Sequence, residues 1–277
     1  MILGCDFDET YRTSDDIRPE ELDAVRRFRK AGNLFGIVTG RAVRETLMYV
    51  VPLCRGEYDF IICCTGGMCI LPDGTYLFRH MHDGVTLPHI YKSARELGMV
   101  FMNFDVTDCA SKISALERGA ALGDGLCETS DGDVFLSGRE RGEYFRHLIS
   151  PDNMKYFDEY NQCTVVFRTP AYAEQAAAVL DEKIAPYGLV THNAHTSIDI
   201  TKNTVSKSSA LFEYAAAQGV PAEAVCTCGD GKNDADMLSA FNGYAMKNGD
   251  AVAIAAAGGK TVDSVASLID MLLGKEV

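Results

Sequence analysis

The chain has 277 residues, of which 47% are hydrophobic and 23% are charged, and its formal net charge at pH 7 is −13. This length predicts about two domains, or one large one, with enough residues for a sizeable buried core. The negative charge argues against nucleic acid or an anionic membrane as the main partner, although a local metal ion or lysine can still attract an anionic substrate.

Targeting signals and membrane segments are not expected. Met1 to Cys5 is too short for a signal peptide before Asp6 follows, and no apolar stretch approaches the ~20 residues of a membrane helix. Several of the ten cysteines lie in apolar runs, where they are expected to pack as small apolar residues in a reducing compartment. The composition therefore predicts a cytoplasmic protein.

The chain opens on the apolar run Ile2 to Cys5, which predicts a strand buried on both faces in a parallel sheet. Asp6, Asp8 and Glu9 follow at once. Side chains two residues apart on extended backbone point the same way, so Asp6 and Asp8 can face one small volume at the end of this strand. Two carboxylates so close need a cation or a proton. The alternative interpretation is a strand end followed by a solvated acidic turn.

The next elements alternate in type and predict βαβ units with a parallel sheet. A small hairpin follows, with its turn at Pro72-Asp73-Gly74. The expected elements are a helix over 19–31, a strand over 34–38, a helix over 42–51, a strand over 60–64 and hairpin strands over 69–71 and 76–78.

From about residue 83 the pattern becomes α+β, and residues 107–142 carry no clear periodicity. The α/β pattern returns near residue 205. We therefore predict a doubly wound, Rossmann-like α/β core over 1–82 and 199–277, and an inserted α+β domain over 83–198. The expected elements are helices over 87–97, 170–186, 205–218, 234–241, 250–257 and 264–273, and strands over 100–104, 163–168, 189–192, 197–200, 224–228 and 243–246.

Two more predicted core strands end in polar residues. Thr39 and Gly40 offer a hydroxyl and backbone N–H groups at a helix N-terminus, which suits a phosphate but also an ordinary N-cap. Asp230 and Asp234 lie in a glycine-rich turn after a buried strand, which favours a metal site over a loop with an N-cap. Lys207 is either a counter-charge for the site or a plain surface lysine.

Because parallel strands end at one edge of a sheet, these side chains are expected to meet there. Carboxylates for a hard cation such as Mg²⁺, a phosphate seat and a lysine together predict phosphoryl transfer.

These stretches resemble the motifs of a known superfamily. Asp6-Phe7-Asp8-Glu9-Thr10 is similar to motif I of the haloacid dehalogenase superfamily of phosphatases, and Val38-Thr39-Gly40-Arg41 to motif II. Lys207 resembles motif III, and Gly229-Asp230-Gly231-Lys232-Asn233-Asp234 resembles motif IV. The size of the insert after the third strand looks most like the Cof-type branch with a C2 cap, in which the cap selects the substrate.

The resemblance implies a role for each matching residue. Asp6 would be the nucleophile that forms an aspartyl-phosphate. Asp8 would be the general acid and then the base, and would give its backbone carbonyl to the metal. Asp230 would be a further metal ligand, and Asp234 would hold a metal-bound water. The implied metal group is thus Asp6, Asp8, Asp230 and Asp234, and the implied phosphate or substrate group is Thr39, Gly40, Arg41, Asn233 and Lys207. Arg41 would either face the substrate or form a structural ion pair.

The sequence departs from the family pattern at three places. Glu9 stands where glycine is usual, which adds negative charge and restricts the turn. Ser208 replaces a glycine that is common after the motif III lysine. Thr65-Gly66-Gly67 stands where the branch more often shows Asn-Gly, so contacts of the cap hinge or the substrate are expected to differ.

We therefore expect a Mg²⁺-dependent phosphatase acting on a small phosphorylated metabolite such as a sugar phosphate. The alternatives are a phosphomutase or phosphotransferase with the same intermediate, and a non-catalytic phosphate-binding module. Arg139, Arg141 and His147 are candidate cap contacts to substrate hydroxyls, without support from spacing. The individual substrate and the oligomeric state are not encoded in any pattern of the sequence.

Overall fold

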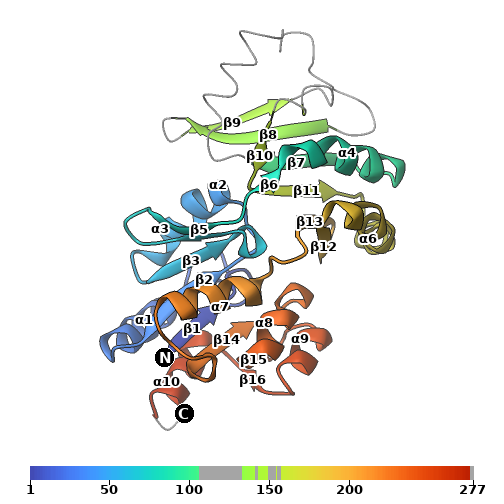
Figure 1. Cartoon of the computed structure of the whole chain (residues 1–277). Coiled ribbons are helices and arrows are strands. Elements are labelled where there is room, and N and C mark those ends of the chain that lie inside the picture. The colour runs from blue at the N-terminus through green and yellow to red at the C-terminus, as the bar shows by residue number, and fades with distance from the viewer. Residues whose placement is uncertain (106–132, 141–142, 149–153, 155–156, 275–277) are drawn as a thin grey trace. The chain divides into compact units, whose positions relative to one another are not determined.

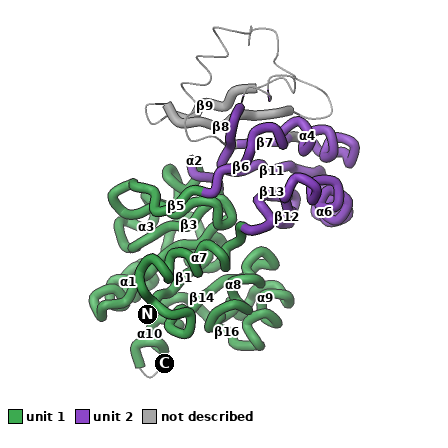
Figure 2. The backbone as a smooth tube through the Cα atoms, in the orientation of Figure 1, with its two compact units in different colours: residues 1–41, 45–79, 205–277 green, residues 42–44, 80–204 purple. Residues whose placement is uncertain are grey.

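The computed structural model describes residues 1–105, 133–140, 143–148, 154 and 157–274 (Figure 1). The chain forms two compact units (Figure 2). The first unit comprises Met1–Arg41, Glu45–Arg79 and Val205–Val277, and the second comprises Ala42–Arg44 and His80–Thr204. In the described ranges, no helix has both the length and the apolar character needed to cross a membrane.

The first unit is built on an eight-stranded sheet with the order β16-β15-β14-β1-β2-β3-β4-β5. Strands β16 to β3 of this order run parallel, and β4 and β5 are antiparallel. The chain order reverses between β1 and β14, which is the switch point where open α/β sheets bind ligands. The strands are β1 (Ile2–Cys5), β2 (Leu34–Val38), β3 (Phe60–Cys63), β4 (Met68–Ile70), β5 (Tyr76–Arg79), β14 (Val225–Gly229), β15 (Asn242–Met246) and β16 (Thr261–Val262).

Helices cover both faces of this sheet, as a doubly wound fold requires. The segment after β2 contains a π-helical turn, η1, between two short α-helices. The helices are α1 (Pro19–Lys30), η1 (Thr46–Val50), α3 (Val51–Cys54), α7 (Lys207–Ala217), α8 (Ala235–Ala240), α9 (Ala251–Ala256) and α10 (Val265–Leu272), with 3₁₀ turns η2 (Cys64–Gly66), η7 (Ala222–Ala224) and η8 (Lys232–Asp234). The first two residues of the short helix α2 (Val43–Glu45) belong to the second unit.

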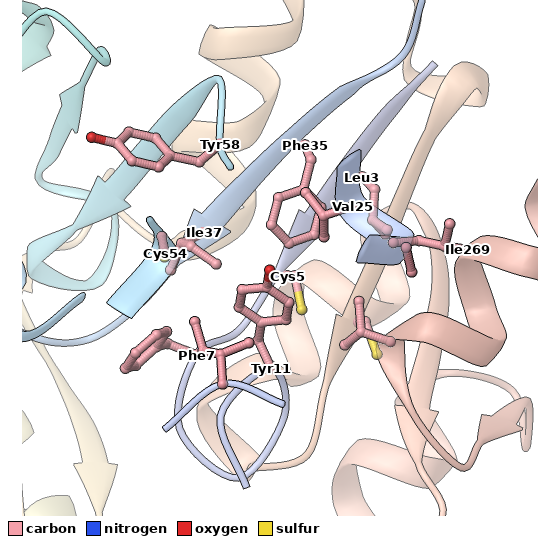
Figure 3. Packing of buried hydrophobic residues seen from close by; sticks show 14 of the residues in the cluster. Leu3, Cys5, Phe7, Tyr11, Val25, Phe35, Ile37, Cys54, Tyr58 and Ile269 are labelled. Atoms are coloured by element: carbon pink, nitrogen blue, oxygen red, sulfur yellow. The ribbon is translucent and has the colours of Figure 1, made fainter. Parts of the chain in front are cut away.

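Successive side chains of β1 point to opposite faces of the sheet, so this strand contributes to an apolar cluster on each face. Leu3 and Cys5 point to one face, where they join a cluster with residues of α1 and α10 such as Val25 and Ile269 (Figure 3). Ile2 points to the other face and packs with Leu211 of α7. A strand buried on both faces has no solvated side, so the charge that follows it falls at the strand end.

The second unit holds a six-stranded sheet with the order β12-β13-β11-β7-β8-β9 and a two-stranded sheet of β10 and β6. Residues of α4 and α6 pack with the larger sheet in one apolar cluster. The elements are β6 (His82–Asp83), η3 (Gly84–Thr86), α4 (Leu87–Glu96), β7 (Phe101–Asp105), β8 (Asp133–Glu140), β9 (Glu143–Leu148), β10 (Glu159–Tyr160), β11 (Gln162–Val166), α6 (Pro170–Ile184), η6 (Ala185–Tyr187), β12 (Leu189–Ala194) and β13 (Ser197–Lys202).

The predicted fold class, a doubly wound parallel sheet with an added α+β part, is confirmed. The π-helical turn was not predicted, because the apolar spacing of 42–51 fits an ordinary helix equally well. Most of the unassigned stretch 107–142 lies outside the described residues, as do Arg141 and the side chains of Arg139 and His147. The assignment of a cap to 83–198 stays a prediction.

Candidate active site

Asp6 and Asp230 leave the sheet side by side at the switch point. The strands β1 and β14 are parallel neighbours with Cys5 opposite Cys228. The backbone N–H of Asp6 extends this ladder by donating to the carbonyl of Cys228 at 2.8 Å. The backbone turns away from the sheet after each of these strands, so that both carboxylates lie at the carboxyl edge of the sheet.

Three carboxylates gather there around one buried lysine. Carboxylate oxygens of Asp6, Asp230 and Asp234 lie within 4.8 Å of one another. Lys207 is 1% exposed, and its Nζ donates to Asp6 Oδ1 at 2.6 Å and to Asp234 Oδ1 at 2.5 Å. One ammonium against three carboxylates leaves a formal charge of about −2 if all are ionised, which matches a divalent cation.

The electrostatics of the cluster reflect this imbalance. Burial raises the pKa of Asp6 well above its ordinary value, the charge of Asp234 raises it further, and Lys207 offsets only part of the effect. Burial likewise raises the pKa of Asp230. For Lys207 burial acts to lower the pKa, but Asp234 and Asp6 outweigh it and the pKa is raised. The lysine therefore stays charged, while the carboxylates need more positive charge.

Two of the carboxylates are held in place by hydrogen bonds from the loop after β14 and from Thr10 in the loop after β1. Asp234 Oδ2 accepts from the backbone N–H of Asp230 at 3.0 Å and of Gly231 at 2.9 Å. Asp230 Oδ1 accepts from the hydroxyl of Thr10 at 2.7 Å. Because both oxygens of Asp234 already accept hydrogen bonds, Asp6 and Asp230 are better placed than Asp234 for direct contact with a cation.

Lys207 is the first residue of α7, and the start of this helix is capped from two sides. Ser206 and Ser209 form a reciprocal capping box. Asp236 of α8 accepts from the backbone N–H of Ser208 at 3.0 Å. This contact uses the backbone of Ser208, which a glycine also has, while the Ser208 hydroxyl lies 3.0 Å from the hydroxyl of the N-cap Ser206.

Asp8 lies in a separate ion-pair network. Arg41 donates from Nε to Asp8 Oδ2 at 2.7 Å and from Nη2 to Oδ1 at 2.9 Å, and Arg12 Nη2 donates to Oδ1 at 2.5 Å. Burial raises the pKa of Asp8, but the hydrogen bonds and charges of Arg41 and Arg12 outweigh it and the pKa is lowered. Arg41 thus contacts Asp8, and the Asp8 carboxylate is not among the three that cluster.

Motif II is held by a tight corner after β3. Thr39 is buried, its hydroxyl accepts from the backbone N–H of Arg41 at 3.2 Å, and its carbonyl accepts from Thr65 N–H at 3.2 Å. Cys64 and Thr65 both have left-handed backbone, with φ of 54° and 53°. Such residues cost energy unless the surroundings hold them, so this corner is a strained feature beside the predicted phosphate seat.

Two further residues of the motifs are Asn233 of motif IV and Glu9 of motif I. Asn233 is half-buried on η8, and a Cβ at Gly231 would lie 2.3 Å from its Oδ1, so the amide folds back over this glycine. Glu9 adopts the left-handed conformation, with φ of 59°, that glycine would take without strain, and its side chain is exposed.

Three residues near the site had no role in the sequence interpretation: Thr10, Arg12 and Asp236. Thr10 was visible as part of motif I, but its pairing with Asp230 spans 220 residues. Arg12 follows Thr10 and Tyr11, and nothing in this stretch indicated its contact with Asp8. No local pattern pointed to Asp236.

Residues 3–265 match the family described as haloacid dehalogenase-like hydrolase. The chain belongs to this family. The recognition made from the four motifs is confirmed. Among curated proteins, none matches the sequence.

Solved structures similar to this haloacid dehalogenase-like hydrolase share its fold along nearly the whole chain. BT1666 from Bacteroides thetaiotaomicron, described among phosphatases of the haloalkanoate (HAD) superfamily, has a TM-score of 0.68 at 20% identity and covers 99% of this chain and 94% of its own. A HAD/COF-like hydrolase from Plasmodium vivax has a TM-score of 0.71 at 17% identity, and the match covers 99% of this chain and 95% of the Plasmodium chain. BT4131, described as a HAD subclass IIB sugar phosphatase, has a TM-score of 0.68 at 16% identity, and the match covers 99% of this chain and 98% of the BT4131 chain.

Proposed function

We propose that this protein is a Mg²⁺-dependent phosphatase that hydrolyses a small sugar phosphate through a phosphorylated Asp6. The observation that carries this proposal is the cluster of buried Asp6 and Asp234 with half-buried Asp230, next to the buried Lys207, at the switch point of the sheet. Membership of a hydrolase family and the fold shared with a described sugar phosphatase support it. The cytoplasmic location stays a prediction.

The residues fit a divalent cation, because the three carboxylates, once all are ionised, carry two negative charges more than Lys207 offsets in a mostly buried place. Asp6 and Asp230 would hold Mg²⁺, with Asp234 and the backbone carbonyl of Asp8 as further proposed contacts. When bound, the ion supplies positive charge against the oxygens of the transferring phosphoryl group.

The chain's own residues would carry the reaction in two steps. In the first, an Asp6 oxygen attacks phosphorus, the bond from phosphorus to the leaving oxygen breaks, and protonated Asp8 gives that oxygen a proton. Because Arg41 and Arg12 lower the pKa of Asp8, this protonated form is a minor one at neutral pH but a strong acid. In the second, water attacks the same phosphorus, Asp8 takes its proton, and the bond to Asp6 breaks to release phosphate. Lys207 would offset charge on Asp6 and the phosphoryl oxygens throughout.

The phosphate seat would be completed by Thr39, Gly40 and Asn233. The Thr39 hydroxyl accepts a hydrogen bond from Arg41 N–H, which leaves its own proton available to a phosphoryl oxygen. The second unit would be the cap that selects the leaving group, as the resemblance to the Cof-type branch implies.

Hydrolysis of an aryl phosphate tests the proposal. The purified protein is expected to release phosphate with Mg²⁺, to lose this activity with a chelator, and to fall to the background rate as Asp6→Asn. Asp15→Asn, which alters an exposed carboxylate of the same segment, is the matched control and is expected to retain full activity. Normal turnover of Asp6→Asn would show that the nucleophile is assigned wrongly.

A panel of phosphorylated metabolites tests the substrate class. Sugar phosphates are expected to be hydrolysed faster than nucleotides or phosphorylated amino acids. Product analysis with an acceptor sugar distinguishes hydrolysis from transfer, since a phosphotransferase would form a new sugar phosphate instead of free phosphate.

A further inference from the structure

The carboxylate of Asp8 is held from two sides by guanidinium groups. Its Oδ1 accepts from both Arg12 and Arg41, and its Oδ2 accepts from Arg41. The Asp8 side chain is 36% exposed, so without these bonds it would have room to change rotamer. The three hydrogen bonds fix both the position and the plane of the carboxylate.

Arg12 is itself anchored. Its Nη1 donates to the carbonyl of Ser14 at 2.7 Å, and its guanidinium lies over the ring of Phe7, 5.6 Å from the ring centroid. The backbone between these residues is closed by two hydrogen bonds, from Arg12 N–H to Phe7 carbonyl at 2.8 Å and from Glu9 N–H to Arg12 carbonyl at 2.9 Å. The left-handed turn at Glu9 therefore brings Arg12 back onto Asp8.

Arg41 is anchored independently, on a different loop. Its backbone N–H donates to Thr39 and its carbonyl accepts from Cys64 N–H at 2.8 Å. The two guanidiniums are thus tied to separate parts of the backbone, Arg12 to the turn that also carries Asp8 and Arg41 to the loop after β2. A side chain held between two fixed partners is pre-organised for directed proton transfer.

We propose that Arg12 is a positioning residue for the leaving-group step, and that it acts through Asp8 by aiming this carboxylate together with Arg41. The proposal rests on the proposed function, in which Asp8 protonates the leaving oxygen. Arg12 need not touch the substrate. We expect substitution of Arg12 to slow only those reactions in which the leaving group must receive a proton.

Leaving groups of different basicity separate this role from a structural one. A nitrophenolate departs without a proton, whereas the alkoxide of a sugar phosphate needs one. The ratio kcat/KM reports the first chemical step and not the later release of phosphate from Asp6. We expect Arg12→Gln to lower kcat/KM at least about tenfold for the best sugar phosphate of the panel, but less than about threefold for p-nitrophenyl phosphate.

A double-mutant cycle completes the experiment. Since Arg12 acts through Asp8, Arg12→Gln is expected to cause no further loss of sugar phosphate hydrolysis when introduced into Asp8→Asn. The matched control is Arg55→Gln, because Arg55 is 56% exposed and pairs with Asp16 on the surface. This control is expected to leave both substrates unaffected.

The outcomes are distinguishable. Equal losses on both substrates, or the same loss of sugar phosphate hydrolysis by Arg12→Gln with and without Asp8→Asn, would overturn the positioning role while leaving the phosphatase proposal intact. Full activity of Asp6→Asn would overturn the proposed function itself.

Discussion

At the scale of single residues, Lys207 shows how a buried charge is stabilised in the site. A fully buried ammonium is tolerated because two carboxylates, Asp6 and Asp234, accept its hydrogen bonds. Removal of one partner of such a group costs about 3–5 kcal/mol, because a buried charge is left uncompensated. In the proposed reaction, the same contacts place the lysine beside the phosphoryl group that Asp6 receives.

His82 in the second unit makes stability depend on pH. It is buried and stacked on Tyr160 with ring centroids 4.8 Å apart, and burial lowers its pKa from 6.5 to about 4, with Lys202 adding to the effect. The unfolded chain therefore binds a proton that the folded chain does not bind between these two values. Stability is intact above the unfolded pKa and falls as the pH drops, by about 2 kcal/mol from pH 7 to about pH 5.

His82→Phe keeps the ring and removes the titration. We expect the variant to lose less stability than the natural chain on acidification, by about 2 kcal/mol, measured by urea unfolding at the two pH values. His89→Phe alters an exposed histidine stacked on Tyr187 and serves as the control. An unchanged pH dependence in His82→Phe would contradict the assignment.

At the scale of elements, α7 and the corner after β3 depend on each other. Gly66 has φ of 102°, and a Cβ there would lie 2.1 Å from the carbonyl oxygen of Ser206, the N-cap of α7. The corner that supports Thr39 thus touches the residue before Lys207. Two of the predicted motifs are joined through this one glycine.

Gly66→Ala tests this coupling. The variant is expected to lose about 3 kcal/mol or more of stability, because a clash with backbone adds to the strain of positive φ. Gly74 also has positive φ, of 84°, but has nothing within 4 Å of an added Cβ. Gly74→Ala is therefore expected to lose only about 1 kcal/mol in the same chemical unfolding measurement. Equal losses would show that the contact with Ser206 is unimportant.

At the scale of the whole molecule, the net charge of the chain and the charge of the clustered carboxylates both favour the binding of a cation. The chain carries −13 overall, and its three clustered carboxylates raise the local density further. A cation that binds only the folded chain stabilises it by mass action, by about 2.7 kcal/mol at a concentration one hundred times its dissociation constant.

We therefore expect Mg²⁺ to raise the melting temperature of the natural chain, but not of Asp230→Asn. Asp263→Asn is the matched control, because Asp263 is exposed and pairs with Lys247 on the surface, and it is expected to retain the shift. Thermal unfolding with Mg²⁺ and with a chelator makes the comparison without any substrate. A shift that persists in Asp230→Asn would place the ion elsewhere.

Much of the fold follows from local pattern. The strand predicted over 34–38 has those bounds, and the helices predicted over 87–97 and 264–273 differ by a residue or so at their ends. Apolar runs and capping residues act within a few positions of the chain, so they are legible without coordinates. The motif residues Asp6, Lys207 and Asp230 are legible for the same reason.

The sequence alone thus determined the fold class, the family and the main chemical groups, because burial pattern and motif chemistry are local. Only the tertiary structure decided which side chains meet: Thr10 with Asp230, Asp236 with the start of α7, and Arg12 with Arg41 on Asp8. These contacts depend on strand register and loop course across as many as 220 residues. No local pattern carries that information, because each of these residues taken alone looks like a polar residue of an ordinary loop.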